Sequence, residues 1–197
     1  IATKIPHVIN MLFTIFQQAW QISAIEDHEE GSDHSFQSSI YNTLIQLLIL
    51  GASVFLLLEK PVVQLLFEQS YHSAWKYIPF LFLSAVFSSL SSFLGTNYVV
   101  TQKTTGAFKT SAVCAVVNTV AALALTPLIG LYGTATASLL AFFVLWIYRA
   151  YDTNKLIRLE LQVKRTVLSL LLLAVQVAVL LLIDHWIMYV LQVVVSV

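Results

Sequence analysis

Long apolar runs alternate with short polar segments along almost the whole chain. A transmembrane helix needs about 20 mostly apolar residues to cross roughly 30 Å of hydrocarbon. The runs predict full spans at about 4–25, 41–58, 77–100, 109–129, 131–150 and 166–183, and a partial seventh at 186–197. They are too long, and alternate too little, for the strands of a membrane β-barrel. The pattern therefore predicts an all-α fold, a polytopic transmembrane helical bundle that occupies residues 1–197 as a single domain.

The connections between these runs are short and carry charge, glycine or proline. We expect loops or turns at the acidic segment 26–34, at Glu59 to Pro61, at Lys103 to Lys109, at Pro127 to Gly133 and at Arg149 to Arg165. In this interpretation carboxylates lie in the loops or at helix ends, and the helices carry none inside the bundle. We also expect the chain to be the C-terminal part of a longer chain, because it starts and ends inside apolar runs.

Composition supports a membrane protein and excludes several classes of function. Hydrophobic residues make up 58% of the chain and charged residues 10%, whereas soluble domains carry roughly 25% charged residues. The formal net charge of zero leaves no basic excess for nucleic acid. The single cysteine, Cys114, excludes an internal disulfide and a multi-cysteine metal site. Because no catalytic, phosphate-binding or dinucleotide-binding motif is present, we expect no enzyme activity, cofactor or metal.

The lysines and arginines are distributed unequally between alternate loops, which predicts the orientation in the membrane. The loops 26–40, 101–109 and 149–165 share one side and carry seven of these residues, five of them in 149–165. The loops on the other side carry two, Lys60 and Lys76. The positive-inside rule therefore predicts that 149–165 lies in the cytoplasm.

The first predicted span carries a stripe of polar residues. Its members are Lys4, His7, Asn10, Thr14, Gln17, Gln18 and Gln21. At about 100° per residue all but Lys4 fall within an arc of roughly 100°. The stripe either lines a water-filled or substrate-holding cavity, or forms a polar seam between helices. We favour the cavity, because six polar residues at regular spacing exceed what a seam requires.

Three further features bear on packing and binding. Lys4 either extends to the membrane interface or is an intramembrane cation that holds an anionic phosphate or takes part in ion coupling. Asn118, in the middle of the fourth span, requires a partner on another helix or a ligand. The third span carries a small-residue face that either permits close helix contact, which we favour, or lines a cavity with hydroxyls; it is formed by Ser84, Ser88, Ser91, Ser92 and Gly95.

Several of these segments resemble a known transporter family. The matching residues are Lys4-Ile5-Pro6, the run from Phe16 to Ala24, Lys60-Pro61 with Leu66-Phe67, Tyr71, Ala74-Trp75, Tyr77-Ile78-Pro79, Asn118 and the turn from Pro127 to Ala135. In their order and spacing, over about residues 1–150, they resemble the bacterial polysaccharide flippases. These are the O-antigen and capsule-repeat exporters of the multidrug/oligosaccharidyl-lipid/polysaccharide superfamily.

The resemblance implies a two-lobe exporter of twelve to fourteen transmembrane helices around a central cavity. Such proteins move undecaprenyl-diphosphate-linked oligosaccharide across the bacterial inner membrane by alternating access, and a coupling ion (H⁺ or Na⁺) is a further expected partner. This chain would be most of the second lobe, with the N-terminal lobe supplied by the same protein. Its substrate path would be Lys4, the other stripe residues and Asn118, with Lys4 attracting the diphosphate and the amides binding sugar hydroxyls.

Three other functions remain open at this point. A drug/cation antiporter or lipid II flippase of the same superfamily is the nearest, but an antiporter is expected to place a carboxylate inside the bundle. A membrane-bound polysaccharide polymerase or ligase requires large external loops, whereas the loops here are short. A structural membrane subunit without a transport path would have a dry, apolar interior around residues 4–21.

Overall fold

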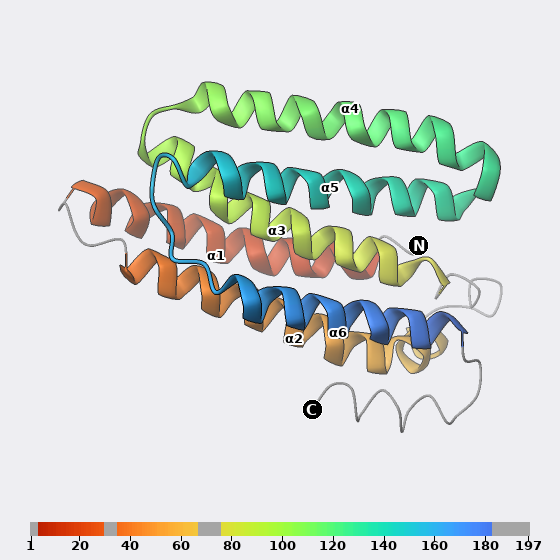
Figure 1. Ribbon diagram of the computed structural model, residues 1–197. Helices are drawn as coiled ribbons and strands as arrows, with labels where there is room; N and C mark the ends of the chain where they lie inside the picture. Colours follow the sequence, from red (N-terminus) through yellow and green to blue (C-terminus); the bar gives the residue numbers. More distant parts are fainter. Residues whose placement is uncertain (1–3, 30–34, 67–75, 183–197) are drawn as a thin grey trace.

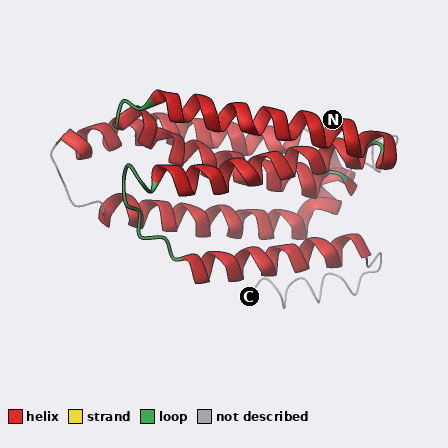
Figure 2. Ribbon diagram, turned by 45° about the horizontal axis from the view of Figure 1, so that its top comes forward, coloured by secondary structure: helices red, strands yellow, loops and turns green. Residues whose placement is uncertain are grey.

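The computed structural model describes residues 4–29, 35–66 and 76–182, and in these ranges the chain forms six α-helices joined by short connections. They are α1 (Lys4–Glu29), α2 (Ser35–Leu66), α3 (Ile78–Val100), α4 (Thr104–Ile129), α5 (Leu131–Thr153) and α6 (Val163–Leu182). The helices lie along roughly one axis and successive helices run in opposite directions (Figure 1). The described ranges contain helices, turns and loops but no strand (Figure 2), so the all-α prediction is confirmed. The partial span predicted at 186–197 lies outside the described residues.

Five of the six helices are long and apolar enough to cross a membrane. The qualifying stretches are Ser35–Glu59, Ile78–Val100, Thr104–Ile129, Leu131–Thr153 and Val163–Leu180. Helix α1 has the length, 26 residues, but is not among the five, because its polar stripe lowers its mean hydropathy. The described chain thus has the character of a helical membrane protein with five such spans, one fewer than the six full spans that the sequence predicts.

The helices extend beyond the apolar runs that predicted them. Helix α4 begins at Thr104 rather than near residue 109, and α5 continues to Thr153. The first four residues of the predicted acidic loop belong to α1, which ends at Glu29, and residues 30–34 lie outside the described residues. An apolar run marks only the part of a helix that suits hydrocarbon, and backbone hydrogen bonding continues into polar residues beyond it. The predicted loop boundaries are wrong for this reason.

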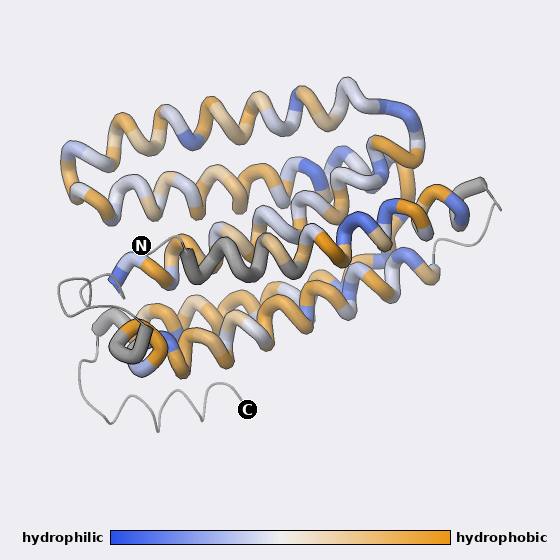
Figure 3. The backbone as a smooth tube through the Cα atoms, turned by 180° about the vertical axis from the view of Figure 1, so that it is seen from behind, coloured by the Kyte–Doolittle hydropathy of each residue, from blue (hydrophilic) through white to orange (hydrophobic). Residues whose placement is uncertain are grey.

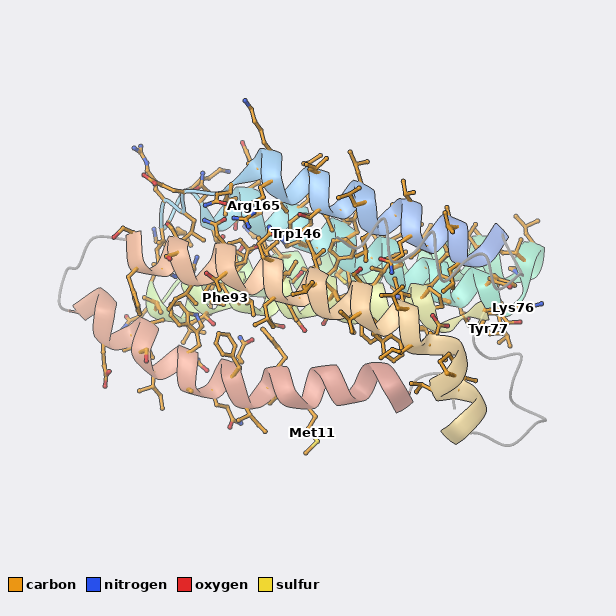
Figure 4. All side chains as sticks on the ribbon, turned by 90° about the horizontal axis from the view of Figure 1, so that it is seen from below. Met11, Lys76, Tyr77, Phe93, Trp146 and Arg165 are labelled. Atoms are coloured by element: carbon orange, nitrogen blue, oxygen red, sulfur yellow. The ribbon has the colours of Figure 1, made fainter. Side chains whose placement is uncertain are left out.

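The predicted loop at Glu59 to Pro61 lies inside α2, which ends at Leu66. Proline inside a helix removes one backbone hydrogen bond and bends the helix rather than ending it here. Figure 4 shows the last turns of α2 bending away from the rest of the helix. The Glu59 side chain is 0% exposed. The prediction that the helices carry no carboxylate inside the bundle is therefore wrong.

Helix α3 is the central element of the bundle. It packs against α1, α2 and α5, while α4 packs mainly on α5 and α6 packs on α2. Ser84 and Ser91 on its small-residue face are buried, and each hydroxyl donates to a carbonyl of α3 itself. Hydroxyls satisfied within their own helix leave a face that neighbouring helices approach closely. Ser84 and Ser91 therefore show the predicted packing role, whereas Ser92 and Gly95 of the same face line a cavity.

An aromatic cluster fixes four helices around Phe93 of α3. The Phe93 ring stacks on Trp20 of α1 with 4.7 Å between ring centroids and on Tyr41 of α2 with 5.0 Å. The Trp146 indole of α5 donates a hydrogen bond of 2.8 Å to the Tyr41 hydroxyl. Stacked rings of this kind contribute beyond the area that they bury. The cluster holds α1 in register with α3, which determines where the polar stripe of α1 lies.

A polar seam joins α2 to α6. Gln176 is 1% exposed, and its amide nitrogen donates to the Ser53 carbonyl at 2.9 Å. In return the Ser53 hydroxyl donates to the Gln176 amide oxygen at 2.8 Å. A second, longer bond of 3.3 Å joins Ser169 to Gln46. Side-chain amides here connect two helices directly, and the bonded residues also border a cavity of about 490 Å³ between α2 and α6.

Replacing Gln176 with leucine is expected to destabilise the folded bundle by about 1 kcal/mol, the order typical of a hydrogen bond between membrane helices. The substitution removes both bonds to Ser53 and leaves a buried hydroxyl unsatisfied. Thermal unfolding of the detergent-purified complete protein, followed by tryptophan fluorescence, should show the loss. Gln46→Leu is the matched control, because it removes only the 3.3 Å bond. An equal or larger loss in the control would contradict this account of the seam.

Candidate functional site

Hydrophilic residues gather at one end of the bundle, where α1, α3 and α5 end and α2, α4 and α6 begin (Figure 3). This arrangement confirms that the connections predicted to share a side do so. The lysines and arginines of the described chain at or near this end are Lys103, Lys109, Arg149, Lys155, Arg158, Lys164 and Arg165.

Near this end a cavity of about 230 Å³ lies between α1, α3, α4 and α5. We call it the polar cavity. Its lining combines two amides and one guanidinium with small residues: Gln17, Gln21, Ser92, Gly95, Thr96, Val99, Ala107 and Arg149. The amides come from the polar stripe of α1, so two of its residues border a cavity, while Gln17 also forms a polar seam with α3.

Gln17 connects the stripe to α3. Its amide nitrogen donates to the Ser92 carbonyl at 2.8 Å and lies 3.3 Å from the Thr96 hydroxyl oxygen. Its amide oxygen is buried and has no hydrogen-bond partner among the described residues. A buried carbonyl-type oxygen without a partner is costly. Because this oxygen is fully buried, a ligand hydroxyl or a water molecule can reach it only after the Gln17 side chain shifts, and in the described conformation Gln17 packs α1 against α3.

Arg149 provides the positive charge of the polar cavity. Its Nη1 donates to the Ser91 carbonyl at 2.9 Å, its Nε to the Thr110 hydroxyl at 3.1 Å and its Nη2 to the Ser111 hydroxyl at 3.0 Å. Gly95 makes room for this arrangement, because a Cβ on Gly95 would lie 2.8 Å from Nη1. The guanidinium is therefore held in one position by contacts to both α3 and α4.

The charge of Arg149 is uncompensated in the described part of the chain. Its three hydrogen-bond partners are a carbonyl and two hydroxyls, and no carboxylate there forms an ion pair with it. The side chain is half-buried, so water screens its charge only in part. A planar guanidinium with donors in a fixed orientation binds phosphate or carboxylate groups well. The polar cavity can therefore bind an anion at Arg149 and hydroxyl groups at the two amides.

The predicted stripe residues fall into three groups. Gln17 and Gln21 line the polar cavity, whereas Thr14 and Gln18 lie on the exposed side of α1. Lys4, His7 and Asn10 are part of the helix, but the positions of their side chains lie outside what the structure describes. The stripe thus includes residues of the cavity and residues of the adjoining exposed surface.

Asn118 does not join this site. It is half-buried on α4 and is not among the residues that line the polar cavity.

Conversely, Arg149 was predicted to begin a charged loop, but it lies within α5, which continues to Thr153. The sequence pattern also did not predict the buried amides of Gln37 and Asn97. The Gln37 amide nitrogen of α2 donates a hydrogen bond of 2.6 Å to the Asn97 amide oxygen of α3.

On the other flank of α1 an apolar groove of about 540 Å³ separates α1 from α2. Its lining is formed by Phe13, Phe16, Ser39, Ile40, Thr43, Leu44, Leu47, Leu48, Gly51, Ala52 and Phe82. We call it the apolar groove. Helix α1 therefore has a polar hollow on one flank and an apolar hollow on the other.

Comparisons of this chain with protein-family models, with curated proteins and with solved structures found no match.

Proposed function

We propose that this chain forms the C-terminal lobe of a flippase for lipid-linked oligosaccharides in the bacterial inner membrane, and that the polar cavity is part of its substrate path. The observation that carries the proposal is the convergence of Gln17, Gln21 and Arg149 on one cavity within a bundle of membrane-length helices. Polar groups at such positions are costly unless they serve a partner or a substrate.

The chemistry of the polar cavity suits a substrate with phosphate and sugar groups. Arg149 supplies the cation for a diphosphate, a role that the resemblance assigned to Lys4. The amides of Gln17 and Gln21 offer donors and acceptors to sugar hydroxyls. The isoprenoid part of the substrate stays in the hydrocarbon, and the apolar groove offers it a surface on the other flank of α1.

The position of the polar cavity fits entry of the substrate from the cytoplasm. It lies at the end of the bundle that carries most of the lysines and arginines, the end that the positive-inside rule assigns to the cytoplasm. Cytoplasmic synthesis of the lipid-linked repeat unit, as the resemblance implies, requires an initial binding site on this side. In an alternating-access cycle, Arg149 would make the first contact with the diphosphate.

One observation favours a second candidate, a cation-coupled exporter of the same superfamily. Glu59 is fully buried within α2, near the end of the bundle opposite the polar cavity. An antiporter is expected to place a carboxylate inside the bundle, and the sequence pattern had argued against one. The two candidates differ in substrate but share the requirement for a coupling site, so Glu59 supports ion coupling in either.

Replacing Gln17 or Gln21 with leucine is expected to reduce export of surface polysaccharide by about tenfold each. The reason is that each loses hydrogen bonds to the substrate, and a hydrogen bond of this kind contributes roughly 1–1.5 kcal/mol. The test is complementation of a flippase-null strain by the complete protein, with export measured as surface polysaccharide per cell. Gln21→Leu is the cleaner variant, because Gln17 also bonds to Ser92 of α3.

Gln46→Leu is the control for this experiment, since Gln46 is a half-buried glutamine of the α2–α6 seam, remote from the polar cavity. It should export at the wild-type level. Immunoblots of the membrane fraction should show that all three variants accumulate equally. Wild-type export by both Gln17→Leu and Gln21→Leu would remove the polar cavity from the substrate path.

A further inference from the structure

Arg149 and Asp152 occupy positions three residues apart on α5. Opposite charges at this spacing on a helix are neighbours and commonly form an ion pair. Here they do not pair. The Tyr98 hydroxyl of α3 donates a hydrogen bond of 2.7 Å to Oδ2 of Asp152, while Arg149 points to Ser91 and to the hydroxyls of α4.

Packing fixes the Tyr98 side chain independently of this hydrogen bond. Tyr98 is 1% exposed. A Cβ on Gly106, in the first turn of α4, would collide with the Tyr98 ring. The glycine therefore leaves the space that the ring occupies between α3 and α4. Because the ring is held by packing, its hydroxyl is a fixed donor that Asp152 can accept without reorganisation.

We propose that Tyr98 holds Asp152 away from Arg149, so that the guanidinium keeps an uncompensated charge and binds a phosphate-type anion at the polar cavity. Tyr98 is thus a positioning residue that sets the anion affinity of the site. The inference rests on the proposed function for its physiological ligand, the diphosphate of a lipid-linked sugar. An anionic phospholipid headgroup has the same chemistry, and the test separates the two sources.

The physical basis is a competition for one guanidinium. When Asp152 is free to approach Arg149, it acts as an internal counter-ion that an incoming anion must displace. A ligand that has to break an existing charged hydrogen bond loses the corresponding part of its binding free energy. Removing the Tyr98 hydroxyl should release Asp152 in this way, and removing the Asp152 charge as well should abolish the competition.

The test compares four forms of the complete protein in phosphatidylcholine nanodiscs: wild type, Tyr98→Phe, Asp152→Asn and the double variant. Binding of inorganic pyrophosphate is measured by calorimetry at constant ionic strength. Tyr98→Phe should weaken binding about tenfold, the equivalent of one charged hydrogen bond. Asp152→Asn should bind at least as tightly as wild type, and the double variant should bind like Asp152→Asn. Rescue by the second substitution separates this role from a structural one, because a packing defect at Tyr98 would persist in the double variant.

A competition experiment identifies the ligand, and the binding results decide whether the inference holds. Undecaprenyl diphosphate in the nanodisc should compete with pyrophosphate more strongly than an equal amount of phosphatidylglycerol, and the reverse order would assign the site to phospholipid headgroups. Equal pyrophosphate affinity in all four forms, or no binding by wild type, overturns the inference. A protein that shows the expected binding pattern but does not export polysaccharide would instead overturn the proposed function alone.

Discussion

Replacing Arg149 with alanine is expected to reduce polysaccharide export to near the level of a flippase-null strain. Arg149 is the cation of the polar cavity, and its three hydrogen bonds join α5 to α3 and α4. Loss of one partner from a desolvated charged contact costs about 2–5 kcal/mol. If transport depends on a diphosphate bound there, this corresponds to a loss on the order of 100-fold.

Two matched variants separate charge, geometry and folding. Arg149→Lys keeps the charge but cannot reach three partners from three separate nitrogens, so export should fall to an intermediate level. Arg158→Ala removes an exposed arginine from the connection after α5 and should export normally. Surface polysaccharide and protein level in the membrane are measured for each strain. Normal export by Arg149→Ala at an unchanged protein level would exclude Arg149 from the transport path.

The polar stripe shows what a helical pattern can predict. The spacing of Gln17 and Gln21 correctly placed both amides on one face of a helix and indicated a cavity beside it. It did not identify the neighbours of this face, the α3 residues Ser92 and Thr96. Periodicity is a property of one helix, whereas the choice of partner depends on packing between distant segments, such as the Trp20–Phe93 stack.

Arg149 was assigned to a loop because the apolar run ends just before it. A signal for its true position is nevertheless present. Buried residues of α5 recur every four positions at Gly133, Ala137, Ala141 and Leu145, and Arg149 is the next position of this series, about 40° around the helix from Leu145. A charged residue in register with a buried face is a candidate for an internal site, even at the edge of an apolar run.

Glu59 was missed for a different reason. Proline is a frequent helix terminator, so Pro61 was interpreted as the start of a loop that also contained Glu59. In the structure α2 bends at this region and continues to Leu66, and the carboxylate is buried. Membrane helices tolerate an internal proline when neighbouring groups satisfy the freed backbone carbonyl. Such compensation comes from tertiary contacts, which a single sequence does not specify.

Attachment of α4 to the bundle should depend strongly on Gly133. Thr110 is the one buried residue of α4, and the helix is held mainly by its contact with α5. Gly133 lies at the start of α5, where a Cβ would be 2.5 Å from the Leu125 carbonyl and the Thr126 nitrogen of the α4 backbone. Since the colliding atoms belong to the backbone, no side-chain rotation relieves the overlap, and the two helices must separate.

Gly133→Ala is therefore expected to destabilise the folded protein by about 2–3 kcal/mol and to lower the unfolding temperature by roughly 5–10 °C. Gly51→Ala is the matched control, because a Cβ on Gly51 in α2 meets no atom within 4 Å. Alanine at this second position should stabilise the helix by about 0.5–1 kcal/mol. Unfolding of both detergent-purified variants, followed by tryptophan fluorescence, should give shifts of opposite sign. If Gly133→Ala unfolds at or above the wild-type temperature, the close approach of α4 and α5 at Gly133 is not what holds α4 in place.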